Sequence, residues 1–136
     1  MDKNFPDVSE RVKAAITDSI VIGLFMLGVV SLFSNFNTVP DFVRISAFIF
    51  IFILYDPIFT SLFGGTIGHM LIGIRVKRES DEKRNILFPL AIVRFIVKAF
   101  LGIISLLTVY SSEKKKAIHD ILVGSIVLYS DNDSKE

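Results

Sequence analysis

The chain has 136 residues, no cysteine and a formal net charge of +1 at pH 7. The lack of cysteine excludes disulfides, thiolate metal sites and cysteine nucleophiles, and the balanced charge gives no reason to expect a nucleic-acid partner. Apolar residues make up 51% of the sequence. A domain this small cannot bury so many of them, so we predict that long apolar segments face lipid.

Two apolar segments are each long enough to cross a bilayer once. Residues 14–33 and 42–63 contain about 20 residues each, the number needed at a rise of about 1.5 Å per residue. The second segment begins after Pro40 and ends at Gly64 and Gly65, residue types that interrupt and terminate helices. We therefore predict two full transmembrane helices over these ranges.

The third apolar segment, residues 86–110, is interrupted by charges. Pro89 suits the first turn of a helix, and Arg94 and Lys98 share one face because they are four residues apart. The segment either crosses fully or is re-entrant, with a bend at Gly102. The positive-inside rule favours the second reading, because both termini are then cytoplasmic and, among the loop cations, only Arg44 lies outside.

The remaining segments are short. Residues 74–77 alternate between apolar and basic side chains, which predicts an extended piece near the interface. Residues 117–130 form an amphipathic segment too short to span, and residues 131–136 form a charged, disordered tail. The predicted fold is thus an all-α membrane protein with a single domain over residues 1–130. No internal repeat is visible.

Two aspartates lie inside the predicted spans, where an isolated charge costs about 2.5–3.5 kcal/mol on insertion scales. Asp18 lies two helical turns after Arg11, and Asp56 is near the end of the second span, so both reach the same half of the membrane. We expect Asp18 to pair with Arg94 or Lys98. That pair either ties helices together or lets protons and cations compete with the base for one carboxylate. Without a nearby base, Asp18 would serve better as a proton relay.

Four short patterns, in this order, resemble those of the RDD family of small membrane proteins. They are an arginine and an aspartate in the first helix, a glycine-rich stretch, an arginine early in the third segment and a late aspartate. In this sequence they are Arg11 with Asp18, the stretch GGTIGHMLIGIRV (with Gly65, Thr66, Gly68, His69, Gly73 and Arg75), Arg94 and Asp120. His69 stands where the family usually has lysine, so a titratable group replaces a fixed charge.

The resemblance implies a transport role, for which cation/proton exchange is the usual suggestion. We predict an integral protein of the plasma (inner) membrane that moves protons or a small cation past a polar cluster comprising Arg11, Asp18, Asp56, Arg94, Lys98 and Asp120. Two or three helices cannot enclose a pathway, so this reading requires a homo-oligomer or a membrane partner subunit. The alternative is a membrane scaffold or assembly factor whose ion pairs are structural.

No set of residues in the sequence indicates catalysis. His69 and His119 lie fifty positions apart without metal-ligand spacing, and the glycine-rich stretch lacks the lysine and hydroxyl residue of a phosphate-binding loop. We therefore expect neither enzymatic activity nor a metal or cofactor.

Overall fold

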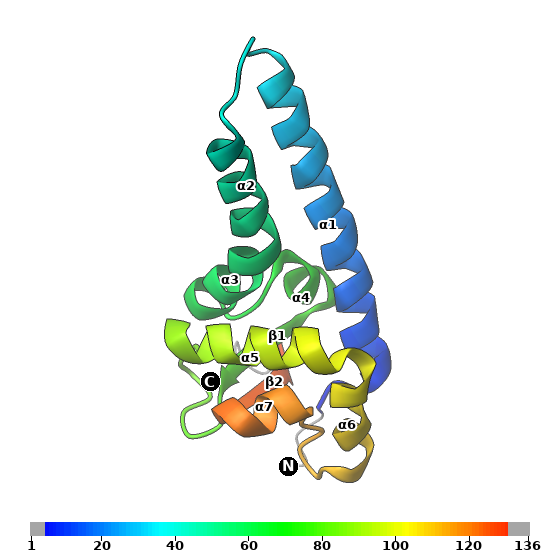
Figure 1. Cartoon of the computed structure of the whole chain (residues 1–136). Helices are drawn as coiled ribbons and strands as arrows, with labels where there is room; N and C mark the ends of the chain where they lie inside the picture. Colours follow the sequence, from blue (N-terminus) through cyan, green and yellow to red (C-terminus); the bar gives the residue numbers. More distant parts are fainter. Residues whose placement is uncertain (1–4, 131–136) are drawn as a thin grey trace.

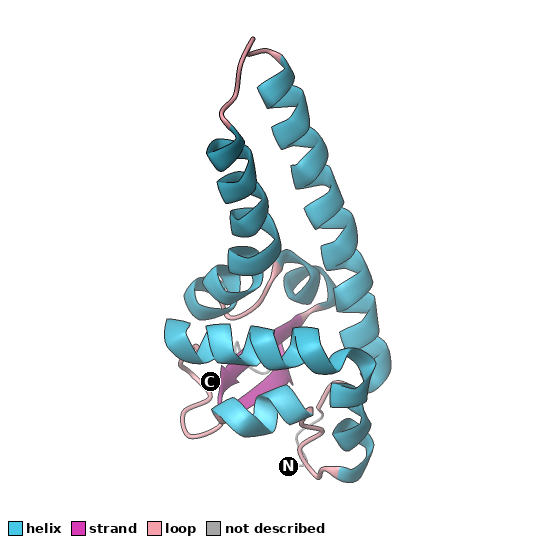
Figure 2. Ribbon diagram, viewed as in Figure 1, coloured by secondary structure: helices cyan, strands magenta, loops and turns pink. Residues whose placement is uncertain are grey.

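The structure, a computed structural model, describes residues 5–130, so the predicted tail at residues 131–136 lies outside the described residues. Within the described range, three helical segments are long and apolar enough to cross a membrane: Val8–Ser34, Asp41–Phe63 and Phe88–Ser111. They correspond to the three predicted apolar segments. The protein is mostly helical, as expected, but a small two-stranded sheet corrects the all-α fold class (Figure 2).

Helix α1 (Val8–Ser34) and helix α2 (Asp41–Ile49) form a long hairpin that projects from the rest of the molecule (Figure 1). Before α1, the backbone N–H of Asp7 donates to the Glu10 carboxylate at 2.9 Å, which satisfies a donor at the helix start. A π-helical turn, η1 (Phe50–Leu54), joins α2 to α3 (Tyr55–Phe63). Pro57 in the first turn of α3 has no N–H, and this interruption of the hydrogen-bond ladder accompanies the π turn.

The hairpin turns its apolar side chains outward. Leu24 and Leu27 of α1 are 63% and 68% exposed, whereas the buried residues of the same helix are Arg11, Ala14 and Asp18. A soluble helix shows the reverse arrangement. In a bilayer, lipid solvates the apolar side chains, and polar groups are buried where they can satisfy one another. Side-chain exposure therefore agrees with helix length in placing this protein in a membrane.

The third apolar segment is helical but does not form one continuous α-helix. It consists of α5 (Phe88–Leu101), a 3-10 turn η2 (Gly102–Leu106) and α6 (Leu107–Ser111). The break falls at Gly102, whose φ of +53° is a conformation that side chains with a Cβ rarely adopt. In Figure 1, α5 runs across the lower end of the α1–α2 hairpin, and α6 turns away from it. The predicted bend is present at Gly102, while the number of crossings stays a prediction.

Two short units with the same local design complete the fold. In the first, α4 (Ile67–Ile72) leads through Gly73 into β1 (Ile74–Arg78). In the second, α7 (Ile118–Val123) leads through Gly124 into β2 (Ser125–Tyr129). Both glycines have the left-handed conformation that ends a helix, with φ of +88° and +68°. The predicted extended piece at residues 74–77 is confirmed as a strand, and the predicted amphipathic segment at residues 117–130 divides into a helix and a strand.

Strands β1 and β2 are counterparts in the two units. Strands β1 and β2 pair antiparallel, with Val76 opposite Val127. These two valines are also counterparts, since Val127 lies as far beyond Val76 along the chain as Gly124 lies beyond Gly73. The sequence shows no internal repeat, but the two units share the order helix, left-handed glycine and strand. Few residues are identical between the units, so the repeat lies in the geometry.

The sheet forms the centre of the small apolar core. Ile74, Val76 and Val127 are fully buried and contact Ala14 of α1 and Ala91 of α5. In Figure 2, the two strands lie beneath α5 and behind α7, at the end of the molecule away from the hairpin tip. Elements from both halves of the chain therefore meet where the charged residues of α1 and α5 are buried.

Candidate functional site

The six residues of the predicted polar cluster form a largely buried polar layer, in which Asp120, near the start of α7, is completely buried. Its carboxylate accepts a hydrogen bond from Arg11 Nη1 at 2.8 Å and another from Arg94 Nε at 3.1 Å. All three side chains are at least 95% buried. Burial alone would raise the pKa of Asp120, but the two guanidinium groups hold that pKa well below its usual range. This ion-paired cluster ties α1, α5 and α7 together.

Asp120 also shapes its own helix. Its Oδ2 accepts from the backbone N–H of Ala117 at 3.2 Å, and its Oδ1 accepts from the Ser125 hydroxyl at 3.0 Å. The first contact satisfies a free N–H at the start of α7, and the second links that helix to β2. One carboxylate thus joins the α7–β2 unit to the long helices.

Asp56 and Lys98 form a second ion pair, between α3 and α5. Lys98 Nζ lies 3.1 Å from Asp56 Oδ2, and the Thr60 hydroxyl donates to the other carboxylate oxygen at 3.2 Å. The Asp56 side chain is 8% exposed, whereas that of Lys98 is 30% exposed. The Asp56 carboxylate is therefore the buried partner, and the Lys98 side chain is the partly exposed one.

Asp18 has a different set of partners from the one that we predicted. Its Oδ1 accepts from the Tyr55 hydroxyl at 2.9 Å and from the backbone N–H of Gly68 at 2.8 Å, and its Oδ2 accepts from the Thr66 hydroxyl at 2.6 Å. All three donors are neutral. The expected ion pair with Arg94 or Lys98 is not formed, because those bases bind the other two aspartates.

The glycine-rich stretch makes this arrangement possible at Gly68. A Cβ added there would lie 2.3 Å from the carbonyl oxygen of Ala14 and 2.7 Å from Asp18 Cγ. Only a glycine allows α4 to approach α1 so closely, and only at this separation does the backbone N–H of α4 reach Asp18. The sequence motif therefore works together with the aspartate that precedes it by fifty residues.

The other motif residues lie around this contact. Gly65 follows the left-handed end of α3, Gly73 ends α4, and Arg75 lies on β1, where its guanidinium donates to the carbonyl of Ile74 at 3.1 Å. Arg75 is half-buried, and among the described residues no hydrogen bond or ion pair joins it to Asp18, Asp56 or Asp120. These residues shape the α3–α4–β1 segment, and the structure does not bring them into the polar layer.

Both histidines are buried and neutral near pH 7. His69 Nδ1 accepts from the backbone N–H of Thr66 at 3.2 Å, and burial together with Lys98 and Arg94 lowers the pKa of His69 to about 3. Likewise, burial and Arg94 lower the pKa of His119 to about 3, and its Nδ1 lies 2.6 Å from the Ser105 hydroxyl. The replacement of a family lysine by His69 thus introduces a group that titrates only in acid.

Several hydroxyl residues of the site were not identified from the sequence, and Tyr55 and Ser105 are two of them. Tyr55 precedes Asp56 and was read only as part of an apolar span, yet it is 4% exposed and binds Asp18. Ser105 lies in the apolar third segment and is fully buried against His119. A hydroxyl within an apolar run is the signal that would have found both. Among residues 5–130, no three His, Asp or Glu side chains gather as metal ligands would.

The chain was compared with known proteins. The sequence model of the RDD family matches residues 5–124, a range that contains all six polar residues of the predicted cluster. No curated protein and no solved structure matches the chain.

Proposed function

Because the chain belongs to the RDD family and is a membrane protein, we propose that it transports protons or a small cation, with Asp18 as the carboxylate that binds and releases the ion. The observation that carries the proposal is the neutral environment of this one aspartate. Asp18 is 8% exposed, lies within a membrane-length helix, and receives its three hydrogen bonds from two hydroxyl groups and a backbone amide. A buried carboxylate with such partners is a candidate for reversible ion binding.

The two other buried aspartates suit this role less well. An ion that bound Asp120 would have to displace two arginines, and an ion that bound Asp56 would have to displace Lys98. Removing one partner from a buried ion pair leaves an uncompensated charge, at a cost of about 3–5 kcal/mol. At Asp18 the hydroxyls of Tyr55 and Thr66 can instead rotate, because a hydroxyl both donates and accepts hydrogen bonds. The same two groups would then offer oxygen lone pairs to an incoming cation.

The proposal includes more than one chain. Two long helices and an interrupted third cannot surround a pathway, so the transporter would be a homo-oligomer or would contain a membrane partner subunit. We place it in the plasma (inner) membrane with both termini in the cytoplasm. This orientation is supported by three lysines, Lys114, Lys115 and Lys116, in the segment between α6 and α7, which lies at the end of the molecule opposite the hairpin tip (Figure 1).

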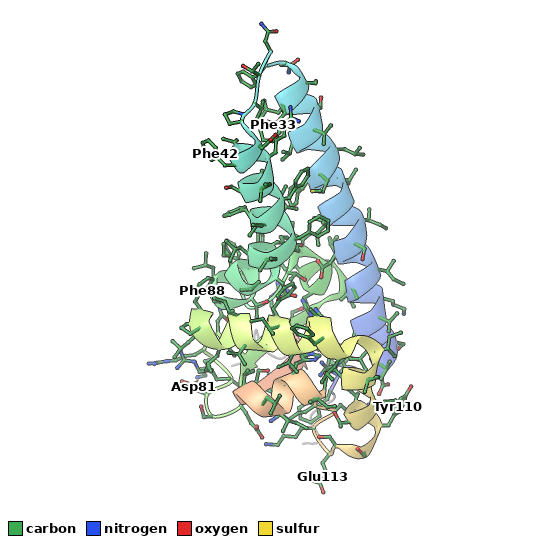
Figure 3. All side chains as sticks on the ribbon, in the orientation of Figure 1. Phe33, Phe42, Asp81, Phe88, Tyr110 and Glu113 are labelled. Atoms are coloured by element: carbon green, nitrogen blue, oxygen red, sulfur yellow. The ribbon has the colours of Figure 1, made fainter. Side chains whose placement is uncertain are left out.

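A flux assay in proteoliposomes tests the proposal. With a pH gradient imposed, addition of Na⁺, K⁺ or Li⁺ should dissipate the gradient in wild-type vesicles and should fail to do so with Asp18→Asn. Asp81→Asn is the matched control, because Asp81 lies in an exposed turn at the end of the molecule (Figure 3) and should leave flux unchanged. Wild-type flux from a folded, inserted Asp18→Asn protein would contradict the role of Asp18.

The second candidate function is a membrane scaffold or assembly factor. The Asp120 cluster favours it, because these ion pairs join three elements that are distant in sequence and have an obvious structural effect. Under this reading, wild-type vesicles show no flux with any of the cations, while Asp120→Asn still destabilises the protein. The wild-type flux measurement therefore separates the two functions.

A further inference from the structure

A cavity of about 350 Å³ lies between α1 and the third apolar segment. It lies within the range of about 300–1,000 Å³ that is usual for ligand pockets. Its α1 wall consists of Val12, Ala15, Ile16 and Ser19, which share one helix face. This face is next to the one that carries Ala14 and Asp18, and Asp18 itself does not line the cavity. The opposite wall includes Ile103, in η2.

The lining of the cavity includes three basic side chains. Arg11, Arg94 and Lys98 line it, together with the two neutral histidines. The three cations have two carboxylate partners, Asp120 and Asp56, so the group keeps an excess of positive charge.

Two cationic side chains in this cavity also have unused donors. Arg11 and Arg94 are 7% and 1% exposed, and among the described residues the buried Nε of Arg11 and Nη1 of Arg94 have no hydrogen-bond partner. These two atoms are sealed from solvent, so a ligand in the cavity would be bound through the charge of the two guanidinium groups and through Lys98, whose side chain is 30% exposed. Guanidinium groups match the oxygens of phosphate especially well.

We propose that this cavity binds the phosphate group of an anionic phospholipid. The positive charge of the two arginines and of Lys98 selects an anion, and the same chemistry would also suit free phosphate. The walls favour the lipid as its source. Ile16 and Ile103 are 57% and 79% exposed on the outer surface of membrane-length helices, where acyl chains would contact them. Arg11 lies one turn from the start of α1, about 5 Å along the helix, which is close to the level of lipid headgroups.

Binding can be measured as thermal stabilisation of the full chain in a non-ionic detergent. Phosphatidylglycerol, phosphatidylcholine and inorganic phosphate are each titrated into wild-type protein. We expect saturable stabilisation by phosphatidylglycerol and none by the other two at the same concentration. Equal stabilisation by phosphatidylcholine would overturn selection of an anion, and equal stabilisation by inorganic phosphate would overturn the lipid as the occupant.

Paired variants locate the site. Ile103→Glu places a carboxylate at the cavity wall, and Ile103→Gln adds a similar side chain without the charge. The apparent affinity for phosphatidylglycerol should fall at least about tenfold in Ile103→Glu and should be retained in Ile103→Gln, since one charged hydrogen bond contributes roughly that factor. Leu122→Glu, on an exposed site of α7 that does not line the cavity, should bind as wild type does. Equal affinities in Ile103→Glu and Ile103→Gln would overturn the proposal.

A second pair of variants and a second measurement keep the test decisive if one of the variants fails to fold. Ser19→Glu and Ser19→Gln make the same comparison from the α1 wall. Native mass spectrometry of the purified wild-type protein should also show one retained acidic lipid per chain, and this species should be absent from Ser19→Glu. A wild-type protein that retains no acidic lipid would overturn the proposal without reference to any variant.

Discussion

The backbone N–H of Gly68 donates to the carboxylate of Asp18 at 2.8 Å, although fifty residues separate them in the chain. The same approach brings Gly68 so close to α1 that a Cβ would fall 2.3 Å from the carbonyl oxygen of Ala14. A single close contact therefore both seats α4 against the first long helix and supplies a donor to its buried aspartate. The hydrogen bonding of Asp18 and the packing at Gly68 therefore cannot be changed independently.

Substitution of Gly68 by alanine should destabilise the protein by about 1–3 kcal/mol, because the added methyl group forces α4 away from α1. Thermal unfolding in detergent measures the effect. Gly28→Ala is the matched control, since an added Cβ at Gly28 has no heavy atom within 4 Å and alanine favours a helix. Equal stability of the two variants would show that α4 does not pack as described.

Asp18 should be energetically coupled to its neutral donors and not to the arginine that we first expected. In a double-mutant cycle of Asp18→Asn with Thr66→Val, we expect a coupling energy of about 0.5–3 kcal/mol, because the two side chains share a hydrogen bond. With Arg94→Gln, whose partner is Asp120, the losses should add to within about 0.5 kcal/mol. A large coupling to Arg94 would restore the ion pair that the sequence suggested.

Loss of the Asp120 carboxylate should be the most damaging change in the polar layer. Asp120→Asn leaves two buried arginines without their counter-ion and should cost about 3–5 kcal/mol of unfolding free energy. Asp56→Asn should cost less, since the lysine that it releases is 30% exposed and can extend its ammonium group to water or headgroups. Chemical denaturation of the two variants would rank them, and the reverse order would contradict the geometry.

The stability of the protein should fall in acid because of its histidines. In the folded protein the pKa of His69 and that of His119 are each lowered from 6.5 to about 3. Between pH 6.5 and pH 3 these histidines bind protons in the unfolded chain but not in the folded protein. The free energy of unfolding is therefore highest above pH 6.5 and decreases as the pH falls toward 3. Each histidine should contribute up to about 1.4 kcal/mol per pH unit over this range.

Unfolding measured between pH 7 and pH 4 in detergent tests this dependence. The double variant His69→Gln, His119→Gln should have a shallower slope than the wild type, even if it is less stable at pH 7. A slope that does not change on removal of both histidines would show that they do not carry the acid sensitivity in this range.

Cysteine labelling should decide the number of crossings. The chain has no cysteine, so a single one can be introduced at Asn37 or at Glu113 without altering any native residue of that type. Figure 3 shows Glu113 at the same end as Asp81 and opposite Phe33 and Phe42, which flank the hairpin tip. We expect an impermeant reagent to label Asn37→Cys in intact cells and Glu113→Cys only after lysis. Labelling of Glu113→Cys in intact cells would mean that the third segment crosses fully.

The long helices were predictable because length and apolarity alone determine them. Residues 14–33 and 42–63 fall within helical segments that run from Val8 to Ser34 and from Asp41 to Phe63. The bend at Gly102 was likewise predictable from a local signal, the glycine itself. The partner of β1 could not be predicted, because β2 is buried at four of its five positions and shows no alternation of apolar and polar residues.

The charged residues were predictable as a group but not as pairs. Sequence spacing places Asp18, Asp56, Arg94 and Lys98 at similar depth, and any acid in such a layer could pair with either base. Pair choice depends on which helix faces which, and α5 crosses the hairpin instead of lying along it (Figure 1). Neutral donors such as the N–H of Gly68 carry no charge signal in a sequence, so the true partners of Asp18 became visible only in three dimensions.

The pair of Arg11 and Asp120 has a consequence for how the protein is made. The ribosome produces Arg11 near the beginning of the chain and Asp120 109 residues later, so the first helix enters the membrane before its counter-ion exists. Strand β1 likewise cannot pair until β2 has been synthesised, because the paired positions of β2 lie up to 55 residues later in the chain. Insertion of the hairpin and closure of the polar layer must be separate events, with Arg11 held in water or among headgroups in the interval. A ribosome-stalled chain ending before Ile118 would hold the inserted hairpin with Arg11 still uncompensated.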